Sequence, residues 1–284
     1  MQFTRILYVL CFLLSCTQVQ AQTDTISPAH IPLDTRYLKP GMRQYLVYFQ
    51  KKGQEKQLFW MNIWQREVKT IMIDNTPVFE TVQHWYSEDS TRYHEILSIN
   101  SIADFQPLYH LQTVGNNTKV YLWSDTDIKG DTVSVNKAKD FQLTFDMPNY
   151  NWNLDLETFE MLPLAADKTF LIRFYDAGLE APKYVTYKVI GTETIQTLDH
   201  QSVACWKLFT AGESPRGKYT QTFWISCKNH ECLKEEDIIG DNMRRYKVKL
   251  PAFSTPSSEK IIQNPGEKIL FYENLRTLYE DFRT

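Results

Sequence analysis

Cys227, His230 and Cys232 form the sharpest local cluster of side chains that could do redox or metal chemistry. A two-residue turn at 229–230 would place Cys227 directly opposite Cys232 in a non-hydrogen-bonded pair, with Cα atoms roughly 4.5 Å apart. That separation lies at the short end of the range for disulfides. We therefore predict a Cys227–Cys232 disulfide with Cys205 as a buried free thiol, and three reduced cysteines are the alternative. The spacing matches no common zinc pattern.

Two other clusters could bind a metal ion. His84 and His94 are expected on neighbouring strands, with His110 nearby, but the spacing supplies no carboxylate to complete a site. The segment 125–131 resembles a calcium loop, yet Lys129 stands where an oxygen ligand is required and the twelfth position lacks Glu. A packed histidine pair and a polar hairpin turn are the better interpretations. We predict no metal site and no cofactor.

The usual signatures of catalysis are absent from the sequence. It contains no G-x-S-x-G, H-E-x-x-H, P-loop or G-x-G-x-x-G motif. Asp155 and Glu157 fall in the first turn of an expected helix, where acidic side chains favour the helix dipole. We therefore expect a protein that is not an enzyme.

Aromatic residues are abundant, at 14% of the chain. They have two interpretations: they fill the core of a sheet, or they line an apolar cavity or groove that binds an acyl chain or another hydrophobic ligand. On the second interpretation the candidate ligand-binding residues are Trp60, Trp64, Trp85, Tyr109, Trp123, Trp206 and Trp224.

The elements that would position these side chains are short strands. Alternating apolar and polar residues recur in runs separated by Gly, Asn and Asp turn signals, a pattern typical of an antiparallel sheet. Symmetrical folding of one hairpin around Asp89 would pair Trp85 with Tyr93 and His84 with His94. The predicted strands are 44–50, 57–66, 78–86, 92–99, 108–114, 119–123, 141–145, 169–175, 183–196, 202–210, 219–227, 232–239 and 244–250.

One internal segment has helical character: 153–162 begins with an N-cap candidate, carries acids in its first turn and ends before Pro163. The fold class predicted is mainly β: a strongly curved antiparallel sheet or open barrel with one short internal helix and a C-terminal helix. The predicted organisation is an extended lead-in at 22–42, a β domain at 43–250 with halves 43–148 and 168–250 joined by the helix, and a linker with a tail helix at 251–284.

The first residues have the composition of a signal peptide. Arg5 precedes an apolar run at 6–15, which is shorter than the roughly 20 residues that span a bilayer. We expect 1–21 to be removed, leaving Gln22 as the mature N-terminus. A lipid anchor at Cys16 is the less favoured alternative. The protein is expected in the periplasm or at the outer membrane.

Charge and hydropathy exclude two classes of partner. The formal net charge is −3, and no basic patch of the kind that binds nucleic acid is present. No other apolar run approaches membrane length, so the mature chain is expected to have no transmembrane span.

Several short phrases follow one another along the chain: IWQ (63–65), PLYH (107–110), NWNLDLE (151–157), LPL (162–164), YKVIGTE (187–193), VACWKL (203–208), TFWIS (222–226) and LKE (233–235). Together they resemble an uncharacterised family of exported Gram-negative proteins, domain of unknown function 3108. The resemblance covers about 43–250 and implies an antiparallel sheet curled around a helix, similar in outline to the carriers of periplasmic lipoproteins. It implies no established activity and no catalytic residues.

These observations favour a non-catalytic cell-envelope protein that binds a hydrophobic or lipid-like ligand, such as a lipid or a lipoprotein acyl chain. The alternative is a structural or interaction module at the outer membrane, which binds an envelope protein and no small molecule. The first requires an apolar cavity or groove, and the second a filled core with an exposed apolar patch.

Overall fold

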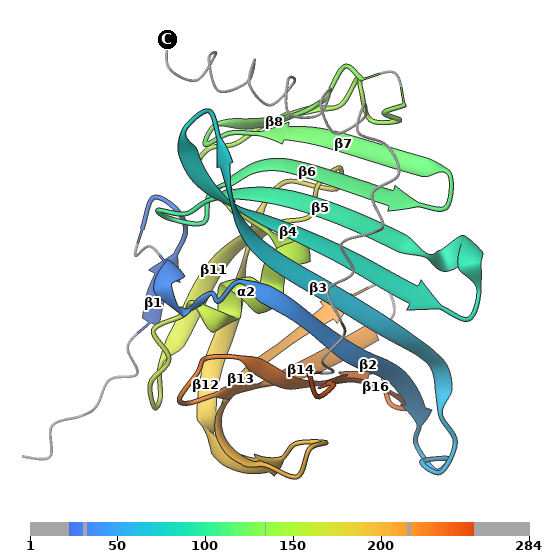
Figure 1. The fold of residues 1–284 in the computed structure, drawn as a ribbon. Helices are drawn as coiled ribbons and strands as arrows, with labels where there is room; N and C mark the ends of the chain where they lie inside the picture. Colours follow the sequence, from blue (N-terminus) through green and yellow to red (C-terminus); the bar gives the residue numbers. More distant parts are fainter. Residues whose placement is uncertain (1–22, 31–32, 134, 215–216, 253–284) are drawn as a thin grey trace, which may run out of the picture.

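A computed structural model describes residues 23–30, 33–133, 135–214 and 217–252. They form one 16-stranded sheet that curls strongly around a short helix (Figure 1). The predicted mainly β, strongly curved and open architecture is therefore confirmed. The predicted signal peptide, the Cys16 anchor and the tail helix lie outside the described residues.

The strands follow the predicted runs closely, and three further strands accompany them: β1, β8 and β10. In chain order they are β1 Thr23–Ile26, β2 Gly41–Lys51, β3 Phe59–Ile73, β4 Thr76–Ser87, β5 His94–Ser101, β6 Pro107–Val114, β7 Asn117–Trp123, β8 Asp127–Gly130, β9 Gln142–Thr144, β10 Tyr150–Asn151, β11 Thr169–Tyr175, β12 Lys183–Gln196, β13 Ser202–Ser214, β14 Gly217–Ser226, β15 Cys232–Ile239 and β16 Met243–Lys249. Short 3₁₀ turns are η1 Thr35–Tyr37, η2 Ser90–Arg92 and η3 Trp152–Leu154.

The sheet consists of two antiparallel meanders, β2–β9 and β11–β16. They are joined by antiparallel pairing of β16 with β2, so the last strand completes the sheet beside the first long one. β1 and β10 add to β11 in parallel. The path of paired strands runs from β1 to β9 without returning to its start, which leaves the curled sheet open.

Helix α2 (Asp155–Glu160) lies against the concave face of the sheet, directly after η3 (Figure 1). Asn151 begins this turn, because its side-chain oxygen accepts a hydrogen bond from the backbone N–H of Asn153 at 3.0 Å. The helix has six residues and its last turn precedes Pro163, which cannot continue the backbone ladder. It is too short to be stable alone, so its packing against the sheet must hold it.

Phe159 is the main apolar anchor of α2. Its ring is fully buried, and its centroid lies 4.7 Å from the ring of Tyr187 on β12 and 4.7 Å from the ring of Phe223 on β14. Phe174 on β11 adds an edge contact at 6.1 Å. The helix therefore packs on strands from the second meander through aromatic side chains.

The register of the β4–β5 hairpin differs from the prediction by one residue. Trp85 pairs with His94 and not with Tyr93, because η2 is inserted in the connection. Asp89 caps η2 by accepting hydrogen bonds from the N–H and the hydroxyl of Thr91. Since side chains alternate between the two faces of a sheet, a shift of one residue moves each of them to a different neighbour.

Candidate functional site

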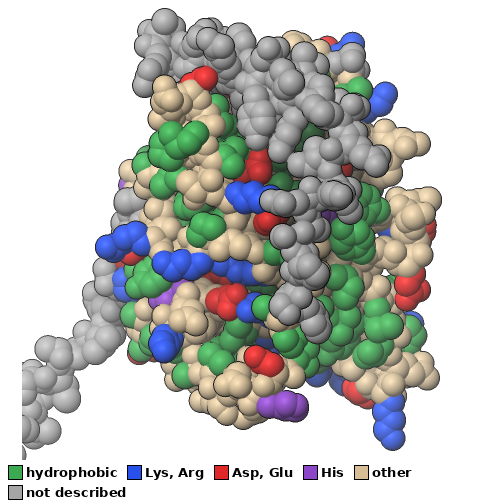
Figure 2. Space-filling view, viewed as in Figure 1, with side chains coloured by type: hydrophobic (Ala, Val, Ile, Leu, Met, Phe, Trp, Pro, Cys, Tyr) green, Lys and Arg blue, Asp and Glu red, His purple; other side chains and the backbone are tan. Residues whose placement is uncertain are grey.

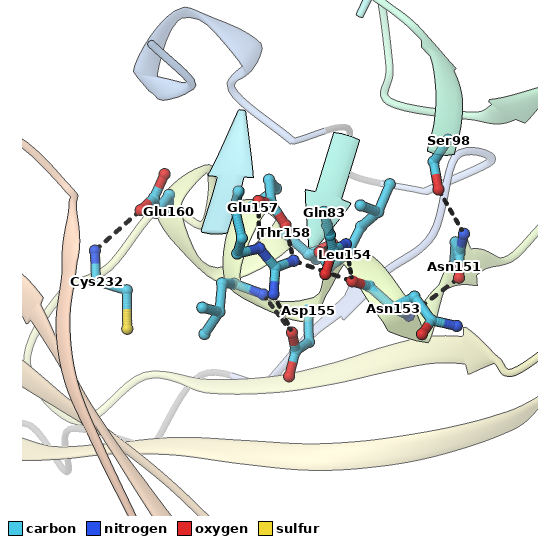
Figure 3. A network of polar contacts seen from close by, with 12 residues as sticks. Gln83, Ser98, Asn151, Asn153, Leu154, Asp155, Glu157, Thr158, Glu160 and Cys232 are labelled. Carbon is cyan, nitrogen blue, oxygen red and sulfur yellow. Dashed lines mark hydrogen bonds and ion pairs between the residues drawn. The ribbon is translucent and has the colours of Figure 1, made fainter. Parts of the chain in front are cut away.

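Arg66 of β3 is buried beneath helix α2 and joins it to the sheet. Its Nε donates to Glu157 Oε1 at 2.9 Å, its Nη2 reaches the other carboxylate oxygen, and Nη2 also donates to the carbonyl of Asn153 at 2.9 Å. Gln83 of β4 donates to the same carbonyl at 2.8 Å (Figure 3). Burial disfavours the charge on Arg66, but Glu157 and Asp155 outweigh it and raise the pKa of Arg66.

A second group of buried charges lies on β15 and β16. Arg245 Nη2 lies 2.5 Å from both Glu235 Oε1 and Asp237 Oδ2, and Lys247 contacts the other Glu235 oxygen. Burial raises the pKa of Asp237 to about 7, with the neighbouring charge of Glu235 adding to it. Burial alone would also raise the pKa of Glu235, yet Lys247 and Arg245 lower it to about 2. The basic neighbours therefore favour the ionised form of Glu235, while burial and the charge of Glu235 favour the neutral form of Asp237.

The far end of α2 is tied to β15 and β2. Glu160 Oε1 accepts a hydrogen bond from the backbone N–H of Cys232 at 3.0 Å (Figure 3). Glu160 Oε2 lies 3.0 Å from Arg43 Nη1. His230 packs flat on Tyr37 with ring centroids 3.7 Å apart, and its Nδ1 lies 3.0 Å from the Glu160 carbonyl oxygen. The carboxylates of α2 thus bind protein partners and serve the fold.

An aromatic column stands beside these charges on the concave face. Trp64 and Trp85 stack with centroids 4.2 Å apart and rings nearly parallel, and His94 stacks on Trp85 at 4.8 Å. Lys247 covers the remaining face of Trp64, with Nζ 4.6 Å from the ring centroid. The cross-strand register of β3, β4 and β5 builds this column.

The column forms one wall of an open pocket of about 510 Å³, called here the aromatic pocket. Trp60 lies at a β-bulge of β3, with φ of 47°, and its side chain is 56% exposed. Phe49 of β2 meets it edge-on at 5.6 Å. The lining residues are Phe49, Trp60, Met61, Asn62, Trp64, Trp85, Ser87, Glu88, Asp89, Arg92 and His94.

Three of the seven predicted ligand-binding aromatics therefore meet in one pocket: Trp60, Trp64 and Trp85. The structure places the other four elsewhere. Tyr109 is buried in a small cluster with Ile73, Val78, Ile99 and Val120, and Trp123 is fully buried against Phe145 and Tyr175. Trp206 packs against the main core, and Trp224 is buried with Cys205 and Leu233.

Two basic side chains over the Trp64 ring were not predicted from the sequence, and neither of them lines the pocket. Arg245 and Lys247 were assigned to a strand without a role, although strand alternation places them on the same face of β16. Arg66 and Trp64, two residues apart on β3, likewise lie on one face of the sheet. This spacing could have shown that the basic side chains share a face with Trp64. It could not have shown their acidic partners, which come from β15 and α2, in distant parts of the chain.

The predicted Cys227–Cys232 disulfide is absent, and all three described cysteines are free. The register behind that prediction was wrong. Cys232 pairs with Ile225, and the turn runs over 227–231, closed by a hydrogen bond from Ser226 N–H to the Glu231 carbonyl at 2.9 Å. Cys227 is therefore in the turn, where its N–H bonds to β13. Burial raises the pKa of Cys205 to about 12, so this thiol stays protonated.

The histidines do not assemble a metal site. Within the described ranges, no group of three or more His, Cys, Asp or Glu side chains is arranged to hold a metal ion. His84 bonds to the Tyr93 hydroxyl at 2.6 Å, while His94 belongs to the aromatic column. No helix among the described residues is long and apolar enough to cross a bilayer.

His110 forms a fully buried cluster with Ser98 and Asn151. Its Nδ1 lies 3.0 Å from Ser98 Oγ and 3.0 Å from Asn151 Nδ2. All three side chains are at most 1% exposed, so no substrate reaches the serine hydroxyl. Burial lowers the pKa of His110 to about 4, which keeps the ring neutral. This cluster supports the fold and has no access for catalysis.

Neutral burial of His110 should make stability depend on pH. The unfolded histidine takes up a proton near pH 6.5, whereas the folded one does so only near pH 4. The contribution of neutral His110 to the free energy of unfolding is therefore complete above pH 6.5. It is lost as the pH falls towards 4, where the free energy of unfolding is lower by about 3 kcal/mol. Urea unfolding across this range should show that His110→Gln removes this loss, while His200→Gln, at an exposed position, keeps it. Equal slopes for His110→Gln and the parent would contradict the assignment.

A solved structure and a family profile are similar to this chain. A solved structure titled "Crystal Structure of Beta-barrel-like Protein of Domain of Unknown Function DUF1849 from Brucella abortus" is similar at 12% identity and a TM-score of 0.46, covering 76% of this chain and 100% of that one. No curated protein matches. The sequence profile of the family described as "Protein of unknown function (DUF3108)" matches residues 44–249, which is most of the chain. The protein therefore belongs to the DUF3108 family.

Proposed function

We propose that this protein is a non-catalytic cell-envelope protein that binds a hydrophobic or lipid-like ligand in the aromatic pocket. The observation that carries the proposal is the open pocket in which Trp60, Trp64 and Trp85 meet. An apolar wall with a few polar groups at its rim is the usual composition of small-molecule sites. Export to the periplasm or the outer membrane is part of the proposal and rests on the composition of residues 1–21.

The shape of the pocket limits how a ligand is held. Both faces of Trp85 are covered, by Trp64 and His94, so a ligand meets the ring edges of the column. Trp60 offers an exposed ring opposite them. The concave face deeper in the sheet is filled by α2, with Phe159 at its centre. The proposed ligand therefore lies at the mouth of the curled sheet and leaves the packed interior undisturbed.

The absence of catalysis in this proposal rests on the partners of the ionisable groups. Glu157, Glu160 and Glu235 each pair with an arginine or lysine of the sheet. Two serine–histidine hydrogen bonds occur among the described residues, Ser98–His110 and Ser27–His30, and in both the serine is fully buried. A general acid or base must reach its substrate within hydrogen-bonding distance.

Binding of a monomeric dansyl-labelled fatty acid tests the proposal. The purified protein is expected to bind it, and Trp60→Ala should weaken the affinity about tenfold, since burying part of an aromatic side chain is worth about 1.4 kcal/mol. Leu179→Ala, at a position that is 62% exposed and does not line the pocket, is the matched control and should bind as the parent does. Fluorescence titration measures both. An affinity equal in both variants, or no binding at all, would remove the proposal.

The second candidate is an interaction module that binds an envelope protein. The specific observation that favours it is the filled interior together with exposed apolar side chains near the pocket mouth. Extraction of the purified protein followed by lipid mass spectrometry separates the two. Bound lipid supports the ligand-binding protein, and clean extracts with failed fatty-acid titration support the interaction module.

A further inference from the structure

The end of the β2–β3 hairpin, residues 51–61, exposes three large apolar side chains. Leu58 is 48% exposed, Trp60 56% and Met61 43%. Figure 2 shows hydrophobic side chains gathered on the side of the molecule where this hairpin projects in Figure 1, with both acidic and basic side chains around them. Single exposed apolar residues are ordinary, but a group of them on a projecting tip indicates a surface that is covered in use.

The backbone of β3 holds these side chains outward. The register between β2 and β3 shifts between Val47 and Phe49, so an extra residue is accommodated opposite them. Trp60 takes a left-handed conformation there, with φ of 47°, which is costly for a bulky residue. As a result the consecutive residues Trp60 and Met61 are both exposed, where a regular strand would turn one of them inward.

The same tip carries positive charge. Lys51, Lys52 and Lys56 are exposed, and Glu55 is the only acid within 51–61. That carboxylate already accepts a hydrogen bond from the backbone N–H of Gly53 at 2.8 Å. Glu88 and Asp89, which line the pocket with Trp60 and Met61, lie next to the tip and are balanced in part by Arg92. Exposed lysines next to exposed Trp and Leu are the composition of segments that rest at the polar–apolar boundary of a membrane.

We propose that the tip at 51–61 docks the protein on an anionic phospholipid surface, with Leu58, Trp60 and Met61 entering the headgroup region and the lysines contacting lipid phosphates. Charge complementarity selects this occupant, because each lysine near an anionic membrane changes the partition by about fivefold. Trp60 and Met61 also line the aromatic pocket, so a docked tip places the pocket mouth at the membrane. This inference goes beyond ligand binding and can fail separately from it.

Sedimentation with vesicles tests the docking. The purified mature chain is expected to bind vesicles of phosphatidylcholine with about one-third phosphatidylglycerol more tightly than vesicles of phosphatidylcholine alone, and salt should weaken the binding. Leu58→Ser and the double variant Lys52→Gln/Lys56→Gln should each reduce the partition at least tenfold. Leu198→Ser and Leu179→Ser are matched controls, because both leucines are exposed on other turns, at 51% and 62%.

The variants also separate docking from ligand binding. Leu58, Lys52 and Lys56 do not line the aromatic pocket, so these variants should bind the monomeric fatty acid as the parent does. Fatty-acid binding without vesicle binding would overturn docking and leave the ligand proposal standing. The docking proposal would also be overturned if Leu58→Ser bound vesicles as tightly as the parent. It would equally be overturned if another protein bound the tip at 51–61 while vesicles did not.

Discussion

Replacing Arg66 with methionine is expected to lower the free energy of unfolding by about 3–5 kcal/mol. The substitution keeps the aliphatic volume but leaves the Glu157 carboxylate buried without its partner, and the Asn153 carbonyl loses one of its two donors. Urea denaturation of both proteins at neutral pH measures the difference. Arg92→Met is the matched control, because its exposed pair with Asp89 should contribute less than about 1 kcal/mol.

A double variant identifies the cause. Arg66→Met combined with Glu157→Met replaces the ion pair with apolar groups, and such replacements are often close to neutral. The double variant should therefore recover most of the stability that Arg66→Met loses. If single and double variants are equally unstable, the loss comes from packing of the arginine stem and the buried-charge explanation is wrong.

Phe159→Ala is expected to cost a similar amount, about 3–5 kcal/mol. The ring is the apolar anchor of α2 and contacts Tyr187 and Phe223, so its removal leaves a cavity between the helix and the second meander. Because a six-residue helix has little stability of its own, amide hydrogen exchange in α2 should rise more than in β11.

The control for this prediction is Leu179→Ala, whose side chain is 62% exposed and should change stability by less than about 0.5 kcal/mol. A loss below about 1 kcal/mol for Phe159→Ala would mean that the helix does not depend on this contact. The charged contacts of Arg66 would then be the main attachment of α2.

Most strands could be predicted because alternation and turn residues are local properties of the sequence. A helix was also predicted at 153–162, and the structure has α2 at Asp155–Glu160, ahead of Pro163. The capping side chain is Asn151, which precedes η3 and lies outside the predicted segment. β1 and β10 were missed because their parallel pairing with β11 joins residues far apart in the chain. β8 was interpreted as part of a polar turn, and its four residues are too short for alternation to reveal.

The candidate site was predicted in part. Trp60, Trp64 and Trp85 were named as ligand-binding residues, but so were Tyr109, Trp123, Trp206 and Trp224, which pack in hydrophobic clusters away from the pocket. Residue type alone does not separate a pocket wall from a core. The stack of Trp85 on His94 depends on the residue that η2 inserts into the hairpin. The prediction assumed symmetrical strand pairing around Asp89, and this assumption takes no account of a 3₁₀ turn inserted between β4 and β5.

The cysteine prediction failed for the same physical reason. A two-residue turn was assumed, whereas the turn at 227–231 is longer and His230 adopts a φ of 58° within it. The stacking of His230 on Tyr37 stabilises this conformation from outside the hairpin. A contact between residues almost two hundred positions apart leaves no local trace in the sequence.

The pairing of β16 with β2 has a consequence for how the chain is made. A polypeptide that emerges from its N-terminus presents β2 long before β16 exists, because β16 ends at Lys249. Until then one edge of β2 has unpaired backbone groups, which can recruit strands of other chains. Completion of the sheet must wait for nearly the whole polypeptide, and such distant pairings form slowly. During synthesis that edge of β2 is therefore expected to need protection by a chaperone.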